Sequence, residues 1–124
     1  MPAIAVHHTQ TSDGEWDASL HEKRLRSGED EQYYRRAYAW SDPDADPTTK
    51  AAYKFIHHEV SEDGTPGPAN LRACSAGIAV LNGGRGGADI PAADRDGVWR
   101  HLAAHLRDAD QEPPELQSEQ RQIE

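Results

Sequence analysis

The sequence predicts a small α+β domain dominated by helices, with about three helices around a modest core, a short strand or hairpin, and extended N- and C-terminal arms. Three observations predict this. Apolar residues recur at helical spacing in three stretches between positions 33 and 106. One run, AAYKFIHHEV at 51–60, alternates as a strand does. The flanking segments hold few large apolar groups, and 124 residues leave room for one domain.

Residues 1–18 are predicted to form an N-terminal arm, because they are mostly polar or small. Ile4, Val6 and Trp16 are the exceptions. An aromatic ring buries a large area at little cost in entropy, so Trp16 is a candidate anchor for a partner surface. The alternative is that Trp16 folds back onto its own domain. Ala3 to Val6 is a candidate partner for the predicted strand.

The compact domain is expected over residues 19–110, and its first helix from Ser19 to Arg26. Leu20 and Leu25 are the only apolar contacts that this helix offers. The SGED sequence that follows supplies a turn and an N-cap for a second helix, with Ser27 or Asp30 as the capping residue.

The second helix is predicted to run through Tyr33, Ala37 and Trp40, which share one face at i, i+4 and i+7. It must end at SDPDADP, where two prolines and three aspartates favour a turn. The strand candidate Ala51–Val60 comes next. SEDGTPGP at 61–68 predicts a loop after it.

A third helix is expected to start at Pro68 and to end at Asn82 and the glycines after it, as a left-handed C-cap would. The last helix is expected to start near Pro91, with Asp94 in its first turn. After Asp110 a polar, proline-broken tail, 111–124, is predicted to be disordered in isolation. The two helices carry apolar stripes at helical spacing: Leu71, Cys74, Ile78 and Leu81 in the third, and Val98, Leu102 and Leu106, widened by Trp99, in the last.

The composition limits the classes of partner. The formal net charge is −9, from 22 acidic and 13 basic residues, and the mean hydropathy is −0.91. Such a charge opposes binding to nucleic acid and to an anionic membrane surface, and it favours a basic protein surface. One cysteine excludes an intrachain disulfide. No apolar run is long enough to span a bilayer and no signal peptide is recognised, so the cytoplasm is the expected compartment.

Histidines are the first candidates for chemistry. They occur as the pairs His7–His8 and His57–His58, and His101 and His105 have the i, i+4 spacing that lets two imidazoles reach one metal ion. Zinc needs a third and usually a fourth ligand. HLAAH lacks the glutamate of the HExxH metalloprotease motif. The sequence therefore favours a packing role for His101 and His105, with no metal and no cofactor.

The other candidate motifs also favour structural roles. Cys74 lies in the middle of an apolar stripe, where a thiol behaves as a small hydrophobic group rather than a nucleophile. GGRGG at 83–87 lacks the GK[ST] of a phosphate-binding loop and is predicted to be a joint. DPDAD at 42–46 lacks the later glutamate of a calcium-binding loop, so a solvated turn is expected.

Two long stretches resemble a known domain. YRRAYAWSDPDADPTTKAAYKFIHHEV, followed by ANLRACSAGIAVLNGGRGGADIPAADRDGVWRHLAAHL, is similar to a small domain of actinobacterial tailed bacteriophages and prophages. That domain occurs beside, or fused to, head-maturation (prohead) protease and capsid proteins. The resemblance covers nearly all of residues 5–115. Ile56 departs from the pattern, because the family often has proline there.

The resemblance implies a role in the virion or in head assembly. The protease proper is absent, since the chain is too short for it and its catalytic histidine and serine have no counterpart here. The expected function is a minor capsid or decoration protein, not an enzyme, that binds the major capsid protein and a second copy of itself on the shell. It would be located in the virion, assembled in the host cytoplasm. Residues expected to bind the partner are Ile4, Val6, Trp16, Tyr33, Trp40 and Trp99.

Three alternatives remain open at this point. One is a head-assembly accessory, scaffold-like or associated with the protease, that leaves before maturation. Another is a small metal-dependent enzyme that uses the histidine pairs. The third is a DNA-binding regulator, which the net charge of −9 opposes.

Overall fold

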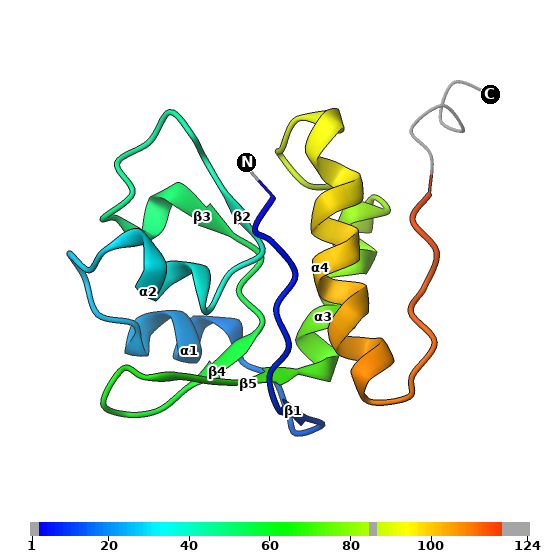
Figure 1. The fold of residues 1–124 in the computed structure, drawn as a ribbon, viewed down its shortest axis with the longest axis horizontal. Helices are drawn as coiled ribbons and strands as arrows, with labels where there is room; N and C mark the ends of the chain where they lie inside the picture. The colour runs from blue at the N-terminus through cyan, green and yellow to red at the C-terminus, as the bar shows by residue number, and fades with distance from the viewer. Residues whose placement is uncertain (1–2, 85–86, 118–124) are drawn as a thin grey trace.

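The fold is α+β, as predicted, and it is seen in a computed structural model that describes residues 3–84 and 87–117. Two longer helices, α3 and α4, form one side of the molecule, and short strands with two short helices form the other (Figure 1). The N-terminal segment runs between the two sides. The helices are α1 (Ala18–Arg24), α2 (Glu31–Arg35), α3 (Leu71–Leu81) and α4 (Arg95–Asp108).

The strands form a small mixed sheet and a separate hairpin. The sheet has the order β1-β5-β4, with β1 parallel and β4 antiparallel to β5, and β2 pairs with β3 in the antiparallel hairpin. The register places His58 opposite Ala69, and it shifts between His58 and Val60. The strands are β1 (Thr11–Ser12), β2 (Trp40–Ser41), β3 (Tyr53–Lys54), β4 (His58–Val60) and β5 (Pro66–Asn70).

The strand predicted over Ala51–Val60 is divided into two. A 3₁₀ turn comes first, then β3, and β4 begins only at His58. Between them Phe55 has a left-handed backbone with φ 68°. That conformation breaks the extended run, so β3 pairs with β2 in one sheet and β4 pairs with β5 in the other. Alternation of side chains alone could not reveal this break.

The second predicted helix begins as expected but ends early. Asp30 is its N-cap, and the Asp30 carboxylate accepts a hydrogen bond from the Tyr33 amide at 3.0 Å. The helix ends at Arg35, so the prediction that Trp40 shares a helical face with Tyr33 is wrong. Trp40 lies in β2 instead, because backbone pairing with Lys54 in β3 replaces the helical hydrogen bonds.

Helix α3 starts three residues later than predicted. Pro68 belongs to β5, and Asn70 caps the helix by accepting from the Ala73 amide at 3.0 Å. The C-terminal end is as expected, at Asn82, followed by Gly83 with φ 104°. The predicted stripe is confirmed as buried, with Leu71, Cys74, Ile78 and Leu81 all at most 5% exposed.

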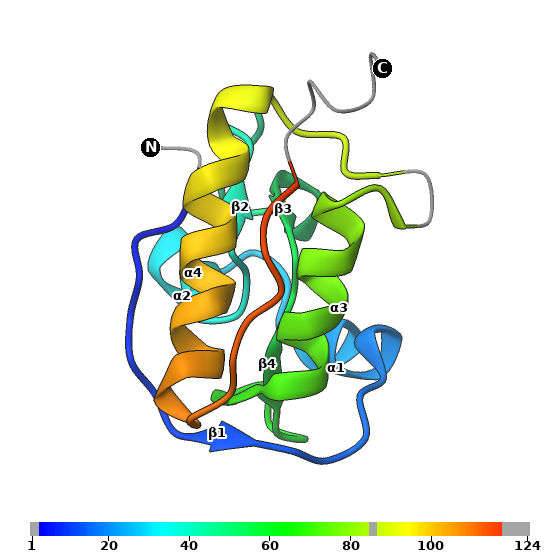
Figure 2. The ribbon, with the colours of Figure 1, turned by 90° about the vertical axis from the view of Figure 1, so that its right-hand side faces the viewer.

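Helix α4 packs antiparallel to α3, and this pair forms one of two hydrophobic cores (Figure 2). A 3₁₀ turn, Ala92–Asp94, precedes α4, so the regular helix begins at Arg95 rather than at Pro91. Val98, Leu102 and Leu106 of its predicted stripe are confirmed as buried in the first core, whereas Trp99, expected to widen the stripe, is half-buried against that core. The second core gathers Tyr33, Tyr34, Tyr38 and Tyr53 with Ile4, Leu25 and Val60.

Both predicted arms contact the domain within the described residues. Ile4 donates its amide to the Ala39 carbonyl at 2.9 Å. At the other end, residues 111–117 lie along α3 and α4, where the Trp99 indole donates to the Pro114 carbonyl at 2.8 Å (Figure 2). The rest of the predicted tail, 118–124, and residues 1–2 lie outside the described residues, as do positions 85–86 of the predicted GGRGG joint.

A candidate metal centre of five histidines

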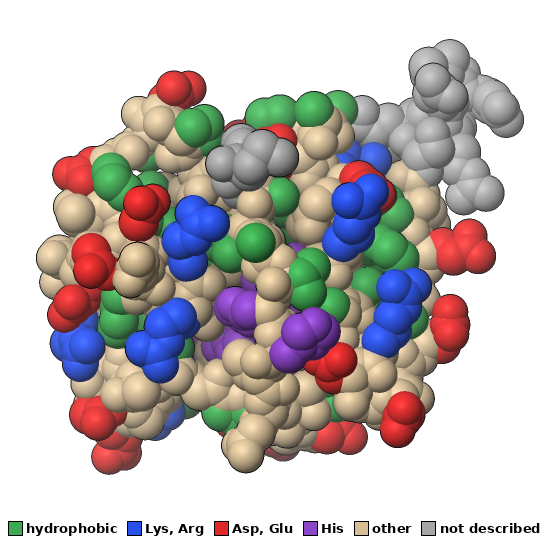
Figure 3. Space-filling view, in the orientation of Figure 1, with side chains coloured by type: hydrophobic (Ala, Val, Ile, Leu, Met, Phe, Trp, Pro, Cys, Tyr) green, Lys and Arg blue, Asp and Glu red, His purple; other side chains and the backbone are tan. Residues whose placement is uncertain are grey.

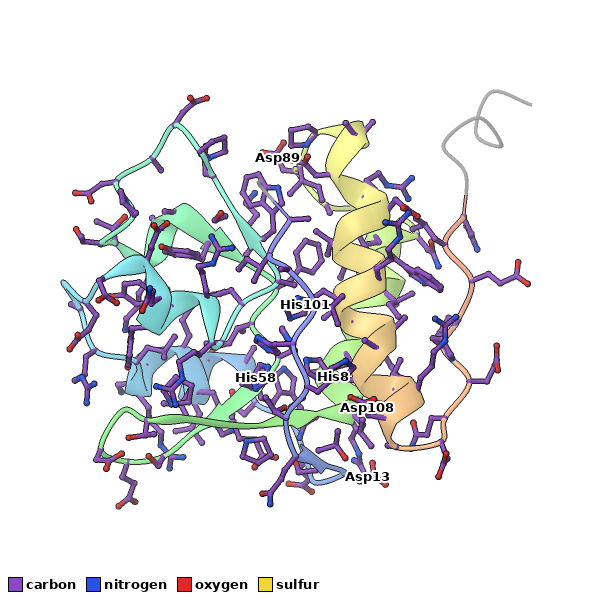
Figure 4. All side chains as sticks on the ribbon, in the orientation of Figure 1. His8, Asp13, His58, Asp89, His101 and Asp108 are labelled. Atoms are coloured by element: carbon purple, nitrogen blue, oxygen red, sulfur yellow. The ribbon has the colours of Figure 1, made fainter. Side chains whose placement is uncertain are left out.

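Five histidines from three separate parts of the chain meet between the two sides of the molecule. One ring nitrogen of each lies within 4.8 Å of the corresponding nitrogen of every other member. Figure 4 shows two of them, His58 and His101, beside the N-terminal segment. We call this set the histidine cluster. Its members are His7, His57, His58, His101 and His105.

Helix α4 supplies His101 and His105. Residues four apart lie one above the other on the same face of a helix, so the two rings point in one direction. The neighbouring stripe of Leu102 and Leu106 packs into the first core and holds α4 against α3. The histidine face is thereby turned toward the N-terminal segment and β4, and both histidine side chains are fully buried.

The segment around the start of β4 supplies His57 and His58. Consecutive residues of a regular strand point to opposite faces. Here the left-handed turn at Phe55 precedes the pair, and His57 stands outside the strand while His58 begins it. Their ring centroids are 4.4 Å apart, and both side chains are fully buried. The irregular backbone therefore lets two adjacent residues serve one site.

Three members of the cluster are oriented by hydrogen bonds from Nδ1 to backbone carbonyl oxygens. His57 bonds to Phe55 at 2.9 Å, His58 to Gly67 at 2.7 Å, and His101 to Ile4 at 2.9 Å. A carbonyl oxygen only accepts, so each Nδ1 carries the hydrogen and each Nε2 presents its lone pair to the cluster. Bonds of this kind commonly fix the orientation of metal-binding histidines.

The resulting lone pairs face one another. The Nε2 atoms of His57 and His101 are 3.1 Å apart, and neither carries a hydrogen when its Nδ1 donates to a carbonyl. Burial lowers the pKa of His57 well below its usual value and that of His101 to about 4, so both rings are neutral near pH 7. Two lone pairs at this distance repel unless a cation lies between them.

Among residues 3–84 and 87–117, His105 finds no hydrogen-bond partner for either ring nitrogen, although its side chain is fully buried. Burial, with smaller contributions from the nearby histidines, lowers its pKa to about 3. A buried polar group without a partner costs about 1–3 kcal/mol. The imidazole of His105 is therefore available to bind a cation.

His7 completes the cluster from the N-terminal segment and is its one half-buried member. Histidine side chains are visible at the surface on this face of the molecule (Figure 3). Its Nε2 lies 3.0 Å from Nε2 of His58, close enough to donate a hydrogen to that lone pair. Burial lowers the pKa of His7, with a smaller contribution from His8. Without a bound metal, His7 can therefore donate a hydrogen to the Nε2 lone pair of His58. It does not relieve the repulsion between the lone pairs of His57 and His101, and it gives His105 no hydrogen bond.

The dimensions and chemistry of the cluster match a transition-metal site. Two nitrogens bound to one zinc ion at about 2.1 Å lie about 3.4 Å apart in a tetrahedron and about 4.2 Å apart at most. The widest separation allowed within the cluster, 4.8 Å, is roughly 0.6 Å above that maximum, so the outermost rings must move inward when one ion binds. Neutral imidazoles suit zinc, copper and nickel, whereas calcium and magnesium require oxygen ligands.

The neighbouring histidine, His8, does not belong to the cluster. Its Nδ1 pairs with the carboxylate of Asp108 at 2.7 Å, and 69% of its side chain is exposed (Figure 4). Cys74 is buried as predicted, and burial raises the pKa of its thiol to about 12. Asp42 and Asp46 accept hydrogen bonds from backbone amides two residues ahead, which is the solvated turn that was expected.

The residues predicted to bind a partner fall into two groups. Ile4, Tyr33 and Trp40 are covered by the chain's own cores, and the Trp40 indole donates to Asp94 at 2.9 Å. The other three keep exposed surface: Val6 is 45% exposed, Trp16 is half-buried, and Trp99 is half-buried.

Trp16 stacks on His21 with ring centroids 4.8 Å apart, so it folds back onto its own domain, where it is half-buried. This confirms the alternative interpretation made from the sequence, and a role for Trp16 as a partner anchor stays a prediction. The imidazole of His21 also accepts from the Val60 amide at 2.9 Å.

Sequence reasoning noted each histidine pair but missed their assembly. The usable signal was the number of pairs: two HH dipeptides and one i, i+4 pair in a chain with seven histidines.

A scan against protein-family models and searches of curated proteins and of solved structures find no match to the chain. Among the described residues, no helix combines the length and apolar character needed to cross a membrane.

Proposed function

We propose that this chain is a metal-binding domain whose histidine cluster holds one transition-metal dication of the zinc class. The observation that carries the proposal is the pair of Nε2 atoms of His57 and His101, 3.1 Å apart with both Nδ1 atoms donating to carbonyls. A metal ion between them converts a repulsion into two coordinate bonds. His58 and the unpartnered His105 supply further ligands.

The centre is suited to a structural role. A catalytic zinc site keeps one coordination position open for water or substrate, whereas a structural site is closed by protein ligands. Here four of the five candidate ligands are fully buried and the fifth covers them. The cluster also joins the N-terminal segment, the start of β4 and α4, so a bound metal would stabilise the folded state over the unfolded chain.

Metal content of the untagged protein tests this proposal. An oligohistidine tag must be left out, because it would bind the same ions. We expect about one equivalent of zinc by elemental analysis after dialysis, and a tetrahedral or five-coordinate absorption spectrum with cobalt. The His57→Ala/His101→Ala double variant should lose the metal, while His8→Ala should keep it. Wild-type protein that binds no stoichiometric zinc, cobalt or copper would refute the proposal.

We propose further that this domain serves as a structural protein of a tailed-phage head, a minor capsid or decoration protein that docks on the major capsid protein. The support is the resemblance of residues 5–115 together with an acidic net charge of −9, which suits a basic protein surface. Val6 and Leu20 are large apolar side chains left 45% and 40% exposed, and they suit burial at such an interface.

Mass spectrometry of purified virions separates this role from that of a head-assembly accessory. A decoration protein is present in the mature particle at a fixed ratio to the major capsid protein. An accessory is found only in immature heads. Absence from both particles would overturn the head-protein role without affecting the metal proposal.

A further inference from the structure

Residues 3–10, which we call the strap, cross the face of the molecule between its two sides (Figure 1). Backbone hydrogen bonds hold the strap at its two ends. The Ile4 amide donates to Ala39 at 2.9 Å, and the Gln10 carbonyl accepts from the Ala69 amide at 2.9 Å. Between these points His7 lies in the cluster, His8 is paired with Asp108, and the backbone of Ala5 interacts with His101.

The five candidate ligands are not equivalent. His57, His58 and His101 are each oriented by a bond from Nδ1 to a carbonyl, and His105 is enclosed in the interior on α4. His7 differs in both respects. It is half-buried, and its ring hydrogen-bonds to His58 of the cluster rather than to a backbone carbonyl. Its neighbours in the strap, Ala5, Val6 and His8, are exposed.

We propose that His7 is the exchangeable ligand of the metal centre, so that metal occupancy fastens the strap across the site. This rests on the proposed metal-binding function. When His7 is bound, the strap covers the ion and closes the coordination sphere. When His7 leaves, one position opens to solvent, while four buried imidazoles keep the ion in place. Metal therefore enters and leaves at the strap, and a small nitrogen ligand can occupy the vacated position.

The physical basis is a difference in what must move. Withdrawing His57, His58 or His101 breaks a carbonyl hydrogen bond and displaces a buried ring, and withdrawing His105 requires a distortion of α4. Withdrawing His7 requires that the middle of an exposed segment lifts, which also breaks the exposed pair of His8 with Asp108. Regions held by few contacts open at the lowest free energy. The centre should therefore exchange through His7 first.

Metal transfer to a chelator tests the proposal. Untagged wild-type, His7→Ala and His8→Ala proteins are loaded with one equivalent of zinc and mixed with excess chelator. His8 is the matched control, since it is the next residue of the same strap and lies outside the cluster. We expect His7→Ala to keep one equivalent but to lose it about tenfold or more faster, as changes at metal ligand shells typically do. His8→Ala should stay within about twofold of wild type.

Two further measurements probe the vacated position and the strap. Free imidazole added to cobalt-loaded His7→Ala protein should restore the wild-type absorption spectrum. Hydrogen exchange at the amides of residues 5–9 should slow on metal addition in wild type but not in His7→Ala. If His7→Ala fails to fold, His7→Gln keeps a hydrogen-bond donor to His58 and replaces it.

The outcomes separate this inference from the function on which it rests. If His7→Ala and His7→Gln bind no metal at all, His7 is an obligatory ligand, and the inference is overturned while the metal centre stands. Equal exchange rates in His7→Ala and His8→Ala overturn it as well. If wild-type protein binds no metal, both the proposed function and the inference fail.

Discussion

Replacing His105 with leucine should raise stability in the metal-free protein and remove most of the stabilisation that zinc provides. In the metal-free protein both ring nitrogens of His105 are buried without a partner. Leucine is similar in volume and carries no polar atom, so it removes a penalty of about 1–3 kcal/mol. For a chain of this length that corresponds to a rise in Tm of roughly 4–12 °C. Removing an unsatisfied buried group is one of the few core substitutions expected to stabilise.

With zinc present the advantage of the leucine variant over the wild type should shrink or disappear. Free metal at a hundredfold excess over Kd stabilises the wild type by about 2.7 kcal/mol. His105→Leu should lose most of that gain, because it removes a ligand. The assay is urea denaturation of untagged protein, treated with chelator and then repeated with zinc, with His8→Ala as the control. Loss of more than about 1 kcal/mol in the metal-free variant would show that His105 has a partner. An undiminished response to zinc would show that it is not a ligand.

Three further predictions test other parts of the molecule. In the metal-free protein, burial lowers the pKa of His58 and His101 to about 4. The unfolding free energy should therefore be highest above pH 6.5, roughly the pKa of histidine in the unfolded chain, and should fall toward pH 4 by up to about 1.4 kcal/mol per pH unit for each histidine. An unfolding free energy that is unchanged between pH 7.5 and pH 5 contradicts this. Cys74→Ala should lower the unfolding free energy by about 1–2 kcal/mol through lost packing but leave the zinc stoichiometry unchanged, and loss of zinc would place the thiol among the ligands. Trp16→Ala removes the ring that stacks on His21. It should weaken binding to purified capsids with little change in Tm, whereas unchanged capsid occupancy would exclude Trp16 from the interface.

Several elements of the fold could be predicted because their signals are local. The buried stripes of α3 and α4 follow from apolar spacing within one helix, and the cap at Asp30 and the end at Asn82 follow from single residues with known backbone preferences. The errors occurred where distant strands competed with local preference. Trp40 was predicted in a helix but pairs with Lys54 in the hairpin, and Pro68 was predicted at a helix start but lies in β5.

The candidate site divides in the same way. The i, i+4 spacing of His101 and His105 already placed both rings on one helical face, and the HH dipeptide placed His57 beside His58. Nothing in these patterns shows which partners the rings meet. The sequence favoured packing for the pair His101 and His105, because two imidazoles alone are too few ligands for a zinc site. The sequence therefore offered three histidine pairs as candidates, with His101 and His105 as the pair of suitable spacing, but gave no reason to combine them in one site.

Local chemistry was thus enough to predict an acidic, α-rich α+β domain, its two principal helices and the burial of Cys74. Only the tertiary structure brought His7 to His58 across 51 residues and His57 to His101 across 44. It also decided which ring nitrogens carry hydrogen, because the carbonyls of Ile4, Phe55 and Gly67 are brought to them by the fold. The physical reason is that a helix face or a cap depends on neighbours along the chain, whereas a shared coordination point depends on how separate elements pack.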